Sequence, residues 1–284
     1  MRNIVRDGHI HSPYCPHGTS DSFGQYITRA LEIGLNEISF TEHLPLPVGF
    51  IDDEIREFCS PSTSTIAAYL EELEQVKQYY QQRIKINTGF EVDYLEGFEG
   101  FTKELLNKYG ARTQDSILSI HFLKVKNQYY CLDATPAMFR ELVELLGGVE
   151  QVYDAYYQTM LKSIRVDLGR YKPRRIGHPT LVRIFNSIFP FEYKNTALLK
   201  QIMLELKARG YEIDFNTAGL RKPYCQELYP SGIFFDLAKR YQIKMVLGSD
   251  AHTAQDVGRS FAAELLSGHD KVCDQAKKTP EEKV

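Results

Sequence analysis

The sequence lacks any long hydrophobic run. No stretch approaches the roughly 18 consecutive apolar residues of a membrane-spanning helix. Residues 1–7 carry a charge at position 2 and contain no apolar segment typical of a signal peptide. We therefore expect no membrane partner and a cytoplasmic location.

The sequence also lacks an excess of charge of either sign. Its formal net charge is −3, and its Lys and Arg residues are scattered rather than clustered. A groove that binds a polynucleotide needs a basic stripe, so we expect no nucleic-acid partner. A small anionic substrate is compatible with this balance, because bound metal ions can supply positive charge locally.

Cysteine patterns typical of disulfide frameworks and cysteine-rich zinc sites are absent. The cysteines form an odd count without a CxxC pair: Cys15, Cys59, Cys131, Cys225 and Cys273. We expect free thiols.

The chain instead alternates short β-branched or apolar runs with longer amphipathic patterns, as strand–helix units do. Strands are expected at 4–10, 37–40, 84–90, 116–120, 175–177, 211–216 and 244–247. Helices are expected at 22–33, 65–82, 98–108, 136–146, 150–166 and 198–208, with a hairpin at 124–132 and a proline-rich lid loop at 45–61. The pattern favours one parallel α/β barrel over residues 1–270, followed by a charged tail at 271–284.

Histidines gather where these strands end. His9 and His11 lie two residues apart on the first strand and share one face, although such a pair alone is more often structural than metal-binding. Other histidines and carboxylates closely follow later strands: His43, Glu91, His121, His178, Asp250 and His252. Because barrel strands end at a common mouth, these side chains should converge there.

His17 lies in a loop that two prolines stiffen, directly after His9 and His11, and we interpret it as a further ligand. His269 has no such placement and is expected on the surface. Seven histidines and two carboxylates exceed the ligands of one ion, so the sequence predicts two or three divalent ions. An imidazole-rich set favours zinc, manganese or iron(II) over magnesium or calcium.

These residues carry a family resemblance. The motifs Asp-Gly-His-Ile-His-Ser, Thr-Glu-His, Gly-Phe-Glu-Val-Asp, Ser-Ile-His, Gly-His-Pro and Ser-Asp-Ala-His resemble, in order, the polymerase and histidinol phosphatase (PHP) superfamily. The loop His-Ser-Pro-Tyr-Cys-Pro-His-Gly is most similar to that of the stand-alone histidinol-phosphatases of histidine biosynthesis. The resemblance implies a single-domain, distorted (β/α)7 TIM-like barrel that hydrolyses the small metabolite L-histidinol phosphate.

The resemblance also implies a trinuclear site. One ion would be held by His9, His11, Glu91 and Asp250. Glu91 would bridge to a second ion, held by His121 and His178. The third would be held by His17, His43 and His252.

Three further carboxylates lie near these ligands. Glu42 adjoins His43 but points the opposite way on its strand, so a buried supporting role is expected. Asp7 and Asp93 each lie two residues from a ligand, and we weigh orientation of an imidazole evenly against an ordinary salt bridge.

A phosphate dianion also needs positive side chains, and the guanidinium of arginine matches its oxygens. Arg183 follows His178, and Arg221 follows the sixth strand. The resemblance implies that arginines in these stretches contact phosphate, whereas Arg174 and Arg175 at the opposite barrel end are expected to be structural.

As a hypothesis, a metal-activated hydroxide attacks phosphorus in line, and Asp250 or His252 passes a proton to the leaving group. Three alternatives stay open. They are a PHP-type nuclease, phosphodiesterase or phosphatase for another small metabolite; a barrel amidohydrolase with a zinc pair; and a metal-binding scaffold. The sequence does not indicate an oligomeric state.

Overall fold

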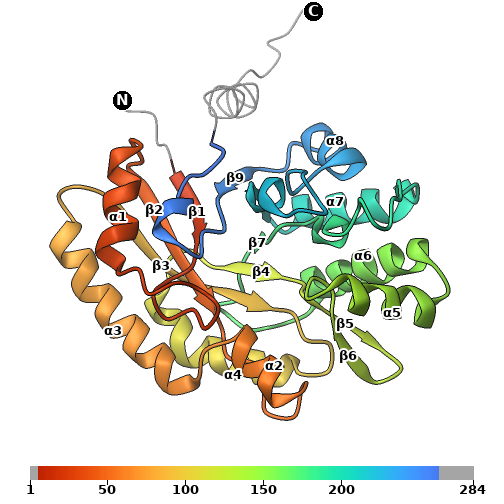
Figure 1. Cartoon of the computed structure of the whole chain (residues 1–284), viewed down its shortest axis with the longest axis horizontal. Coiled ribbons are helices and arrows are strands. Elements are labelled where there is room, and N and C mark those ends of the chain that lie inside the picture. Colours follow the sequence, from red (N-terminus) through yellow and green to blue (C-terminus); the bar gives the residue numbers. More distant parts are fainter. Residues whose placement is uncertain (1–5, 262–284) are drawn as a thin grey trace, which may run out of the picture.

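Seven parallel strands form a nearly closed barrel in the computed structural model, which describes residues 6–261 (Figure 1). Their order around the barrel follows the chain, β1-β2-β3-β4-β7-β8-β9. The bounds are β1 Arg6–Ile10, β2 Glu37–His43, β3 Lys85–Asp93, β4 Ile117–Ser119, β7 Arg175–Ile176, β8 Glu212–Asn216 and β9 Met245–Gly248. The predicted distorted (β/α)7 barrel is confirmed.

The barrel closes between its first and last strands. Ile10 and Ala251 form an isolated parallel bridge, and the amide of His11 donates to the carbonyl of Ala251 at 2.9 Å. The amide of Asp250 donates to the carbonyl of His9 at 2.8 Å. Closure therefore joins the two segments that carry four of the predicted ligands, His9, His11, Asp250 and His252.

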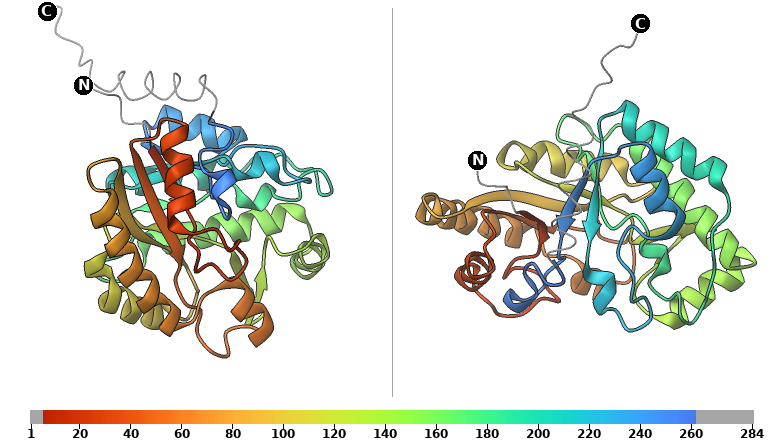
Figure 2. Two further views of the ribbon diagram at one scale, coloured as in Figure 1. Left: turned by 60° about the vertical axis from the view of Figure 1, so that its left-hand side comes forward. Right: turned by 90° about the horizontal axis from the view of Figure 1, so that it is seen from above.

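Helices cover the outside of the barrel (Figure 2). They are α1 Phe23–Glu32, α2 Asp53–Cys59, α3 Thr63–Tyr80, α4 Glu99–Tyr109, α5 Pro136–Leu146, α6 Val149–Arg165, α7 Thr196–Ala208 and α8 Gly232–Arg240. Helix α1 illustrates the local causes: Ser22 and Gln25 form a capping box at its start. Its Phe23 and Ile27 face the core, and Gly34 with a φ of 81° follows its end.

Two helices were not predicted from the sequence, α2 and α8. Helix α2 lies where a lid loop was expected; it is short and has no buried residue, so it leaves no apolar period in the sequence. Helix α8 follows Ser231 and packs through Phe234 and Leu237.

Strands β2 and β3 are longer than predicted. They continue through His43 and Asp93, and both are buried along nearly their whole length. His43 and Glu91 therefore lie within strands rather than after them. Polar residues are tolerated at these strand ends because their side chains line the polar cavity at the barrel mouth.

The expected hairpin is confirmed as β5 Phe122–Val125 and β6 Gln128–Cys131. Its two-residue turn, Lys126-Asn127, has φ values of 49° and 65°, the hand that suits the twist of a hairpin. A small apolar cluster joins this hairpin to the segment before α2, with Phe50 packed against Phe122.

The N-terminal end of the barrel is sealed by a buried ionic network. Arg175 is 2% exposed and donates to the carbonyl of Gly8 at 2.7 Å and to Asp115 at 3.0 Å. Arg6 pairs with the same carboxylate. The predicted structural role of Arg175 is confirmed, and Arg174 is exposed.

Four of the cysteines are free thiols, as predicted: Cys15, Cys59, Cys131 and Cys225. The fifth cysteine, His269 and the tail boundary at residue 270 lie outside the described residues, so those predictions stay untested. Within residues 6–261 no helix combines the length and apolar character needed to cross a bilayer.

Candidate metal centre

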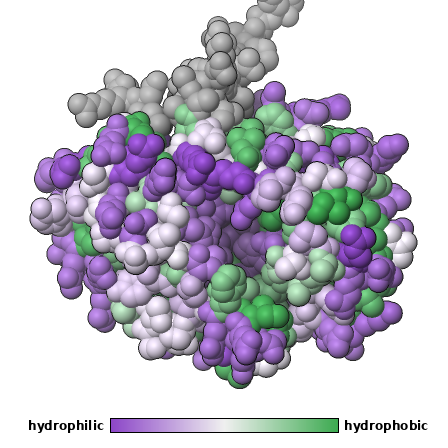
Figure 3. Space-filling model, viewed as in Figure 1, coloured by the Kyte–Doolittle hydropathy of each residue, from purple (hydrophilic) through white to green (hydrophobic). Residues whose placement is uncertain are grey.

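The mouth of the barrel contains a cavity of about 970 Å³. Figure 3 shows a hollow with hydrophilic walls near the centre of the face seen in Figure 1. Seven of the nine predicted ligands line the cavity: His17, His43, Glu91, His121, His178, Asp250 and His252. His9 and His11 lie beneath them, fully buried.

The first group of donors surrounds a single point. His9 Nε2 lies 3.5 Å from both Glu91 Oε2 and Asp250 Oδ1. His11 Nε2 lies 3.3 Å and 3.2 Å from the same two oxygens. Donor atoms about 2.1 Å from one shared ion lie about 3.0 to 3.4 Å apart, so this spacing fits one bound ion.

The second group uses the other oxygen of Glu91. His178 Nε2 lies 2.9 Å from Glu91 Oε1 and 3.2 Å from His121 Nε2. Glu91 therefore faces two donor groups with its two oxygens, as a bridging carboxylate does. His178 has a φ of 22° and Asp250 a φ of 54°, strained values for residues with side chains that are typical of functional sites.

The third group is looser. His17 Nε2 lies 3.0 Å from His252 Nε2, and the His11 and His252 rings stack at 3.9 Å. His43 is 4.4 Å from the His11 ring, and neither of its nitrogens has a hydrogen-bond partner in the described structure. Cys15, expected from the sequence only as a free thiol, places its sulfur near His11, His43 and His252.

Supporting groups fix which nitrogen of each ring is free. His9 Nδ1 donates to Asp214 Oδ2 and His121 Nδ1 donates to Asp93 Oδ1, both at 2.7 Å. His17 Nδ1 donates to the Phe58 carbonyl at 2.9 Å. Each bond leaves Nε2 with its lone pair, the form that binds a metal ion.

The nitrogen lone pairs of His17 and His252 point toward each other. His252 Nδ1 donates to the carbonyl of Asp250 at 3.1 Å, so both His17 and His252 present unprotonated Nε2 atoms 3.0 Å apart. Two such atoms repel unless a cation or a proton lies between them. The Nε2 atoms of His9 and His11 are buried and have no hydrogen-bond partner in the described structure, so they also require a cation or a proton.

The carboxylates and imidazoles are strongly coupled. Burial lowers the pKa of His9, but the neighbouring carboxylates of Asp250, Asp214 and Glu91 outweigh burial and raise this pKa to about 10. Burial and the nearby His11 hold the pKa of His43 and of His252 well below the ordinary value. A dense set with such opposed shifts is typical of a functional site.

Glu42 and Asp93 support ligands, while Asp7 does not. Glu42 lies 3.6 Å from His11 Nδ1 and accepts the Ser12 amide at 3.0 Å. Asp7 contacts no imidazole; it accepts the amide protons of Ser249 and Gly258, both at 2.9 Å. It thus secures the chain on either side of the last ligands, a role neither predicted alternative covered.

Asp214 and Asn216 were missed. Both are fully buried on β8, and Asn216 Nδ2 donates to Asp214 Oδ2 at 2.9 Å while lying 3.4 Å from Asp250 Oδ2. The signal was available, because two polar residues spaced by two on an apolar strand point to one side.

The two predicted phosphate-binding arginines differ. Arg221 lines the cavity; its Nη2 donates to the Ser249 carbonyl at 2.8 Å, and its buried Nη1 has no hydrogen-bond partner in the described structure. Arg183 does not line the cavity. Its guanidinium forms two hydrogen bonds with Glu227, at 2.6 Å and 2.8 Å. We therefore keep Arg221 alone as a phosphate-binding candidate.

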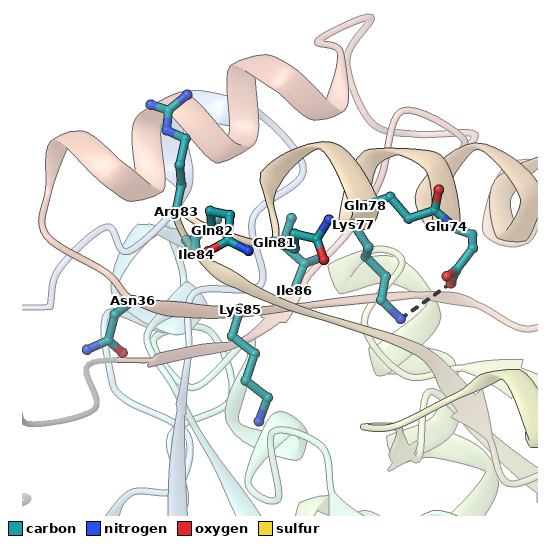
Figure 4. A pocket seen from close by; sticks show the side chains of 10 residues that line it. All are labelled: Asn36, Glu74, Lys77, Gln78, Gln81, Gln82, Arg83, Ile84, Lys85 and Ile86. Atoms are coloured by element: carbon teal, nitrogen blue, oxygen red, sulfur yellow. Dashed lines mark ion pairs between the residues drawn. The ribbon is translucent and has the colours of Figure 1, made fainter.

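Another cavity, of about 490 Å³, lies at the opposite end of the barrel, by the start of β3 and the end of α3 (Figure 4). Its lining contains no histidine, and Lys77 pairs with Glu74 across part of it. It offers no comparable set of donors.

A barrel mouth crowded with imidazole and carboxylate donors, with the guanidinium of Arg221 lining the same cavity, defines a metal-dependent hydrolase of anionic esters. A model of the PHP domain matches residues 7–218, and a model described as PHP-associated matches residues 235–264. This chain belongs to the PHP domain family.

Individual relatives agree with this assignment. The histidinol-phosphatase of Bacillus subtilis is 41% identical over 262 residues, which are 92% of this chain and 98% of that protein. A crystal structure from Listeria monocytogenes, named as a candidate histidinol phosphatase, has a TM-score of 0.87 at 39% identity, over 91% of this chain and 99% of that one.

A histidinol phosphate phosphatase from Lactococcus lactis, solved with zinc, L-histidinol and phosphate, has a TM-score of 0.67 at 19% identity. It covers 95% of this chain and 94% of that one, and it supports the fold.

Proposed function

We propose that this chain is a metal-dependent phosphomonoesterase that hydrolyses L-histidinol phosphate to L-histidinol and phosphate. The observation that carries the proposal is the set of Nε2 atoms and carboxylate oxygens 2.9–3.5 Å apart at the barrel mouth. The full-length match to a histidinol-phosphatase, at 41% identity, supplies the substrate.

We propose three ion sites, with zinc, manganese or iron as occupants. The donors are those predicted: His9, His11, Glu91 and Asp250 in the first, Glu91, His121 and His178 in the second, and His17, His43 and His252 in the third. Ions bound there supply Lewis acidity and a nucleophile at neutral pH. The imidazole-rich donor set supports transition metals over magnesium.

Arg221 binds the phosphate in this proposal. Nη2 donates to the Ser249 carbonyl, which fixes the plane of the guanidinium at the wall of the cavity. Lys222 and Arg259 line the same side of the cavity and add positive charge. A preorganised cation of this kind stabilises charge on the phosphoryl oxygens as the ester bond breaks.

The leaving alkoxide needs a proton. Asp250 and His252 remain the two proposed donors, because both line the cavity and their side chains are 16% and 27% exposed. Both also contribute to ion sites, so one of them must be the weaker ligand. Unequal pH profiles of Asp250→Asn and His252→Gln, with ions counted in each, would tell which.

The test is phosphate release from L-histidinol phosphate by metal-loaded protein, with a panel of phosphorylated metabolites and an oligonucleotide in parallel. We expect the highest kcat/KM for L-histidinol phosphate and none for the oligonucleotide. Cleavage of the oligonucleotide alone would favour the nuclease alternative, and preference for another monoester would reassign the substrate.

A further inference from the structure

The cavity is lined by charged residues of both signs besides the donors of the metal centre. Its cationic residues, Arg221, Lys222 and Arg259, come from the segments that follow β8 and β9. Its carboxylates outside the predicted ligand set are Glu54, Asp93, Asp133 and Asp256. Residues of both signs in one cavity suit a substrate that carries phosphate at one end and a cation at the other.

Two of those carboxylates are already neutralised. Asp93 accepts from His121 at 2.7 Å. Asp256 pairs with Arg259 at 2.6 Å and lies 3.7 Å from Arg221. Within residues 6–261, Glu54 and Asp133 take part in no ion pair.

Asp133 is the more unusual of these two. It is partly buried on the loop between β6 and α5, and the hydrogen bond made to it comes from the weak thiol donor of Cys131, at 3.2 Å. Glu54 is exposed and lies in the first turn of α2, where the helix itself stabilises negative charge. A carboxylate half withdrawn from water without a cation is incompletely compensated.

Asp133 lines the same cavity as His121, His178 and Arg221. The apolar side chains of Met138, Leu181 and Ile184 line the same cavity. A molecule whose phosphate lies at Arg221 therefore shares this cavity with Asp133 and with apolar side chains.

L-histidinol phosphate carries such cations. Its ammonium is on the carbon next to the phosphate-bearing CH2 group, and its imidazole is one carbon further away. We propose that Asp133 is a specificity-determining residue that binds a cationic nitrogen of the substrate. This inference rests on the proposed function and adds the side chain that selects the alcohol.

The test compares Asp133→Asn with wild type, both metal-loaded, on four substrates. These are L-histidinol phosphate, its analogue without the amino group, the phosphate ester of 2-aminopropanol, which lacks the imidazole, and p-nitrophenyl phosphate. We expect kcat/KM for L-histidinol phosphate to fall roughly 10- to 100-fold and that for p-nitrophenyl phosphate to stay within about twofold. The analogue that loses sensitivity to the substitution identifies the nitrogen bound.

Glu54→Gln is the matched control, because it removes an unpaired carboxylate from the same cavity and should leave all four values unchanged. Ion content and thermal unfolding of each variant exclude a folding defect, and Asp133→Glu should recover part of the selectivity. Equal losses on all substrates, or none, would overturn the inference while leaving the function intact. No turnover of L-histidinol phosphate by wild type would overturn both.

Discussion

At the residue scale, the imidazoles of the metal centre are oriented through their Nδ1 atoms. Asp214, Asp93 and the Phe58 carbonyl each accept one Nδ1 proton. The acceptors come from three different elements, so the free Nε2 atoms are fixed by the fold as a whole. Removing one acceptor should loosen one ligand without deleting it.

Arg221 is the residue whose loss should affect catalysis most selectively. Arg221→Ala should lower kcat/KM about 100- to 1000-fold, or about 3 to 4 kcal/mol, because a preorganised donor to the phosphate is lost. Ion content, measured by elemental analysis, should not change. Unchanged kinetics would remove Arg221 from the site.

Arg183 provides the contrast. Arg183→Ala removes the ion pair with Glu227, whose side chain is 27% exposed and keeps hydrogen bonds from Asn186 and Ser231, so the free energy of unfolding should fall by about 1 to 2 kcal/mol. The kcat/KM of the folded enzyme should hold. A selective loss of activity at constant stability would restore Arg183 as a phosphate-binding residue.

Asp7 should make stability depend on pH. Burial raises its pKa from 3.8 to about 6, and hydrogen bonds from Ser249, Gly258 and His9 offset this only in part. Below pH 3.8 the group is protonated in both states; between there and about pH 6 only the unfolded state releases the proton, so stability is lost as pH rises.

The measurement is the difference in unfolding free energy between wild type and Asp7→Asn, both treated with the same chelator. It should fall by about 2 kcal/mol between pH 4.5 and 7.5, because a pKa unit corresponds to about 1.4 kcal/mol. A flat or rising difference would contradict the shift.

The sequence predicted which side chains meet at the barrel mouth better than it predicted the residues that support them. His9, Glu91 and Asp250 follow from strand ends and residue type. Asp214 was missed because it lies inside a strand, whereas the candidates were residues at strand ends. The ion pair of Arg183 could not be predicted from its spacing to His178, because its partner Glu227 lies 44 residues further along the chain.

At the element scale, α2 and the hairpin form one edge of the mouth. The segment before α2 is held by Phe50, which is 4% exposed and whose ring lies 5.0 Å from Phe122 and 4.3 Å from Tyr129. The end of α2 in turn holds His17 through the Phe58 carbonyl. Packing in the apolar cluster around Phe50 therefore helps to fix the position of α2 and, through it, the orientation of the His17 ring.

Phe50→Ala tests that connection. The cavity it leaves should cost about 3 to 5 kcal/mol locally, so hydrogen exchange in residues 45–60 should quicken and ion content should fall below that of the wild type. Phe234→Ala, in α8 and equally buried, is the control: it should lower global stability but keep the ions. Full ion content in Phe50→Ala would show that packing around Phe50 does not affect ion binding by His17.

Periodicity explains which elements could be predicted. Helices such as α1 and α6 bury one face and carry that pattern in their sequences. Helix α2 buries nothing, so tertiary position and its Asp52 cap determine it rather than apolar spacing. Strand limits were underestimated at His43 and Asp93 because polar residues normally end a strand, whereas here they face the barrel mouth.

At the scale of the whole molecule, the metal centre connects most of the barrel. Its donors come from β1, β2 and β3 and from the segments after β4, β7 and β9, so they span both sides of the closure between β1 and β9. Without ions, buried carboxylates and imidazole lone pairs face one another. Binding of ions to the folded state alone should therefore stabilise the entire barrel.

Chelation should consequently change both activity and stability. An ion at 1,000 times its dissociation constant contributes about 4 kcal/mol, and each kcal/mol shifts Tm by about 2 to 4 °C in a domain of this size. We expect a thoroughly chelated protein to lose activity and to melt roughly 10 °C lower, and zinc, manganese or iron to restore both, whereas magnesium should not.

Arg221→Ala separates the two effects, because it should show the same change in Tm on chelation while remaining poorly active in every state. Full activity in metal-depleted wild type would refute a metal-dependent reaction. An unchanged Tm with lost activity would place the ions in catalysis alone, and the barrel would then have to be held closed by its backbone bonds at Ile10 and Ala251.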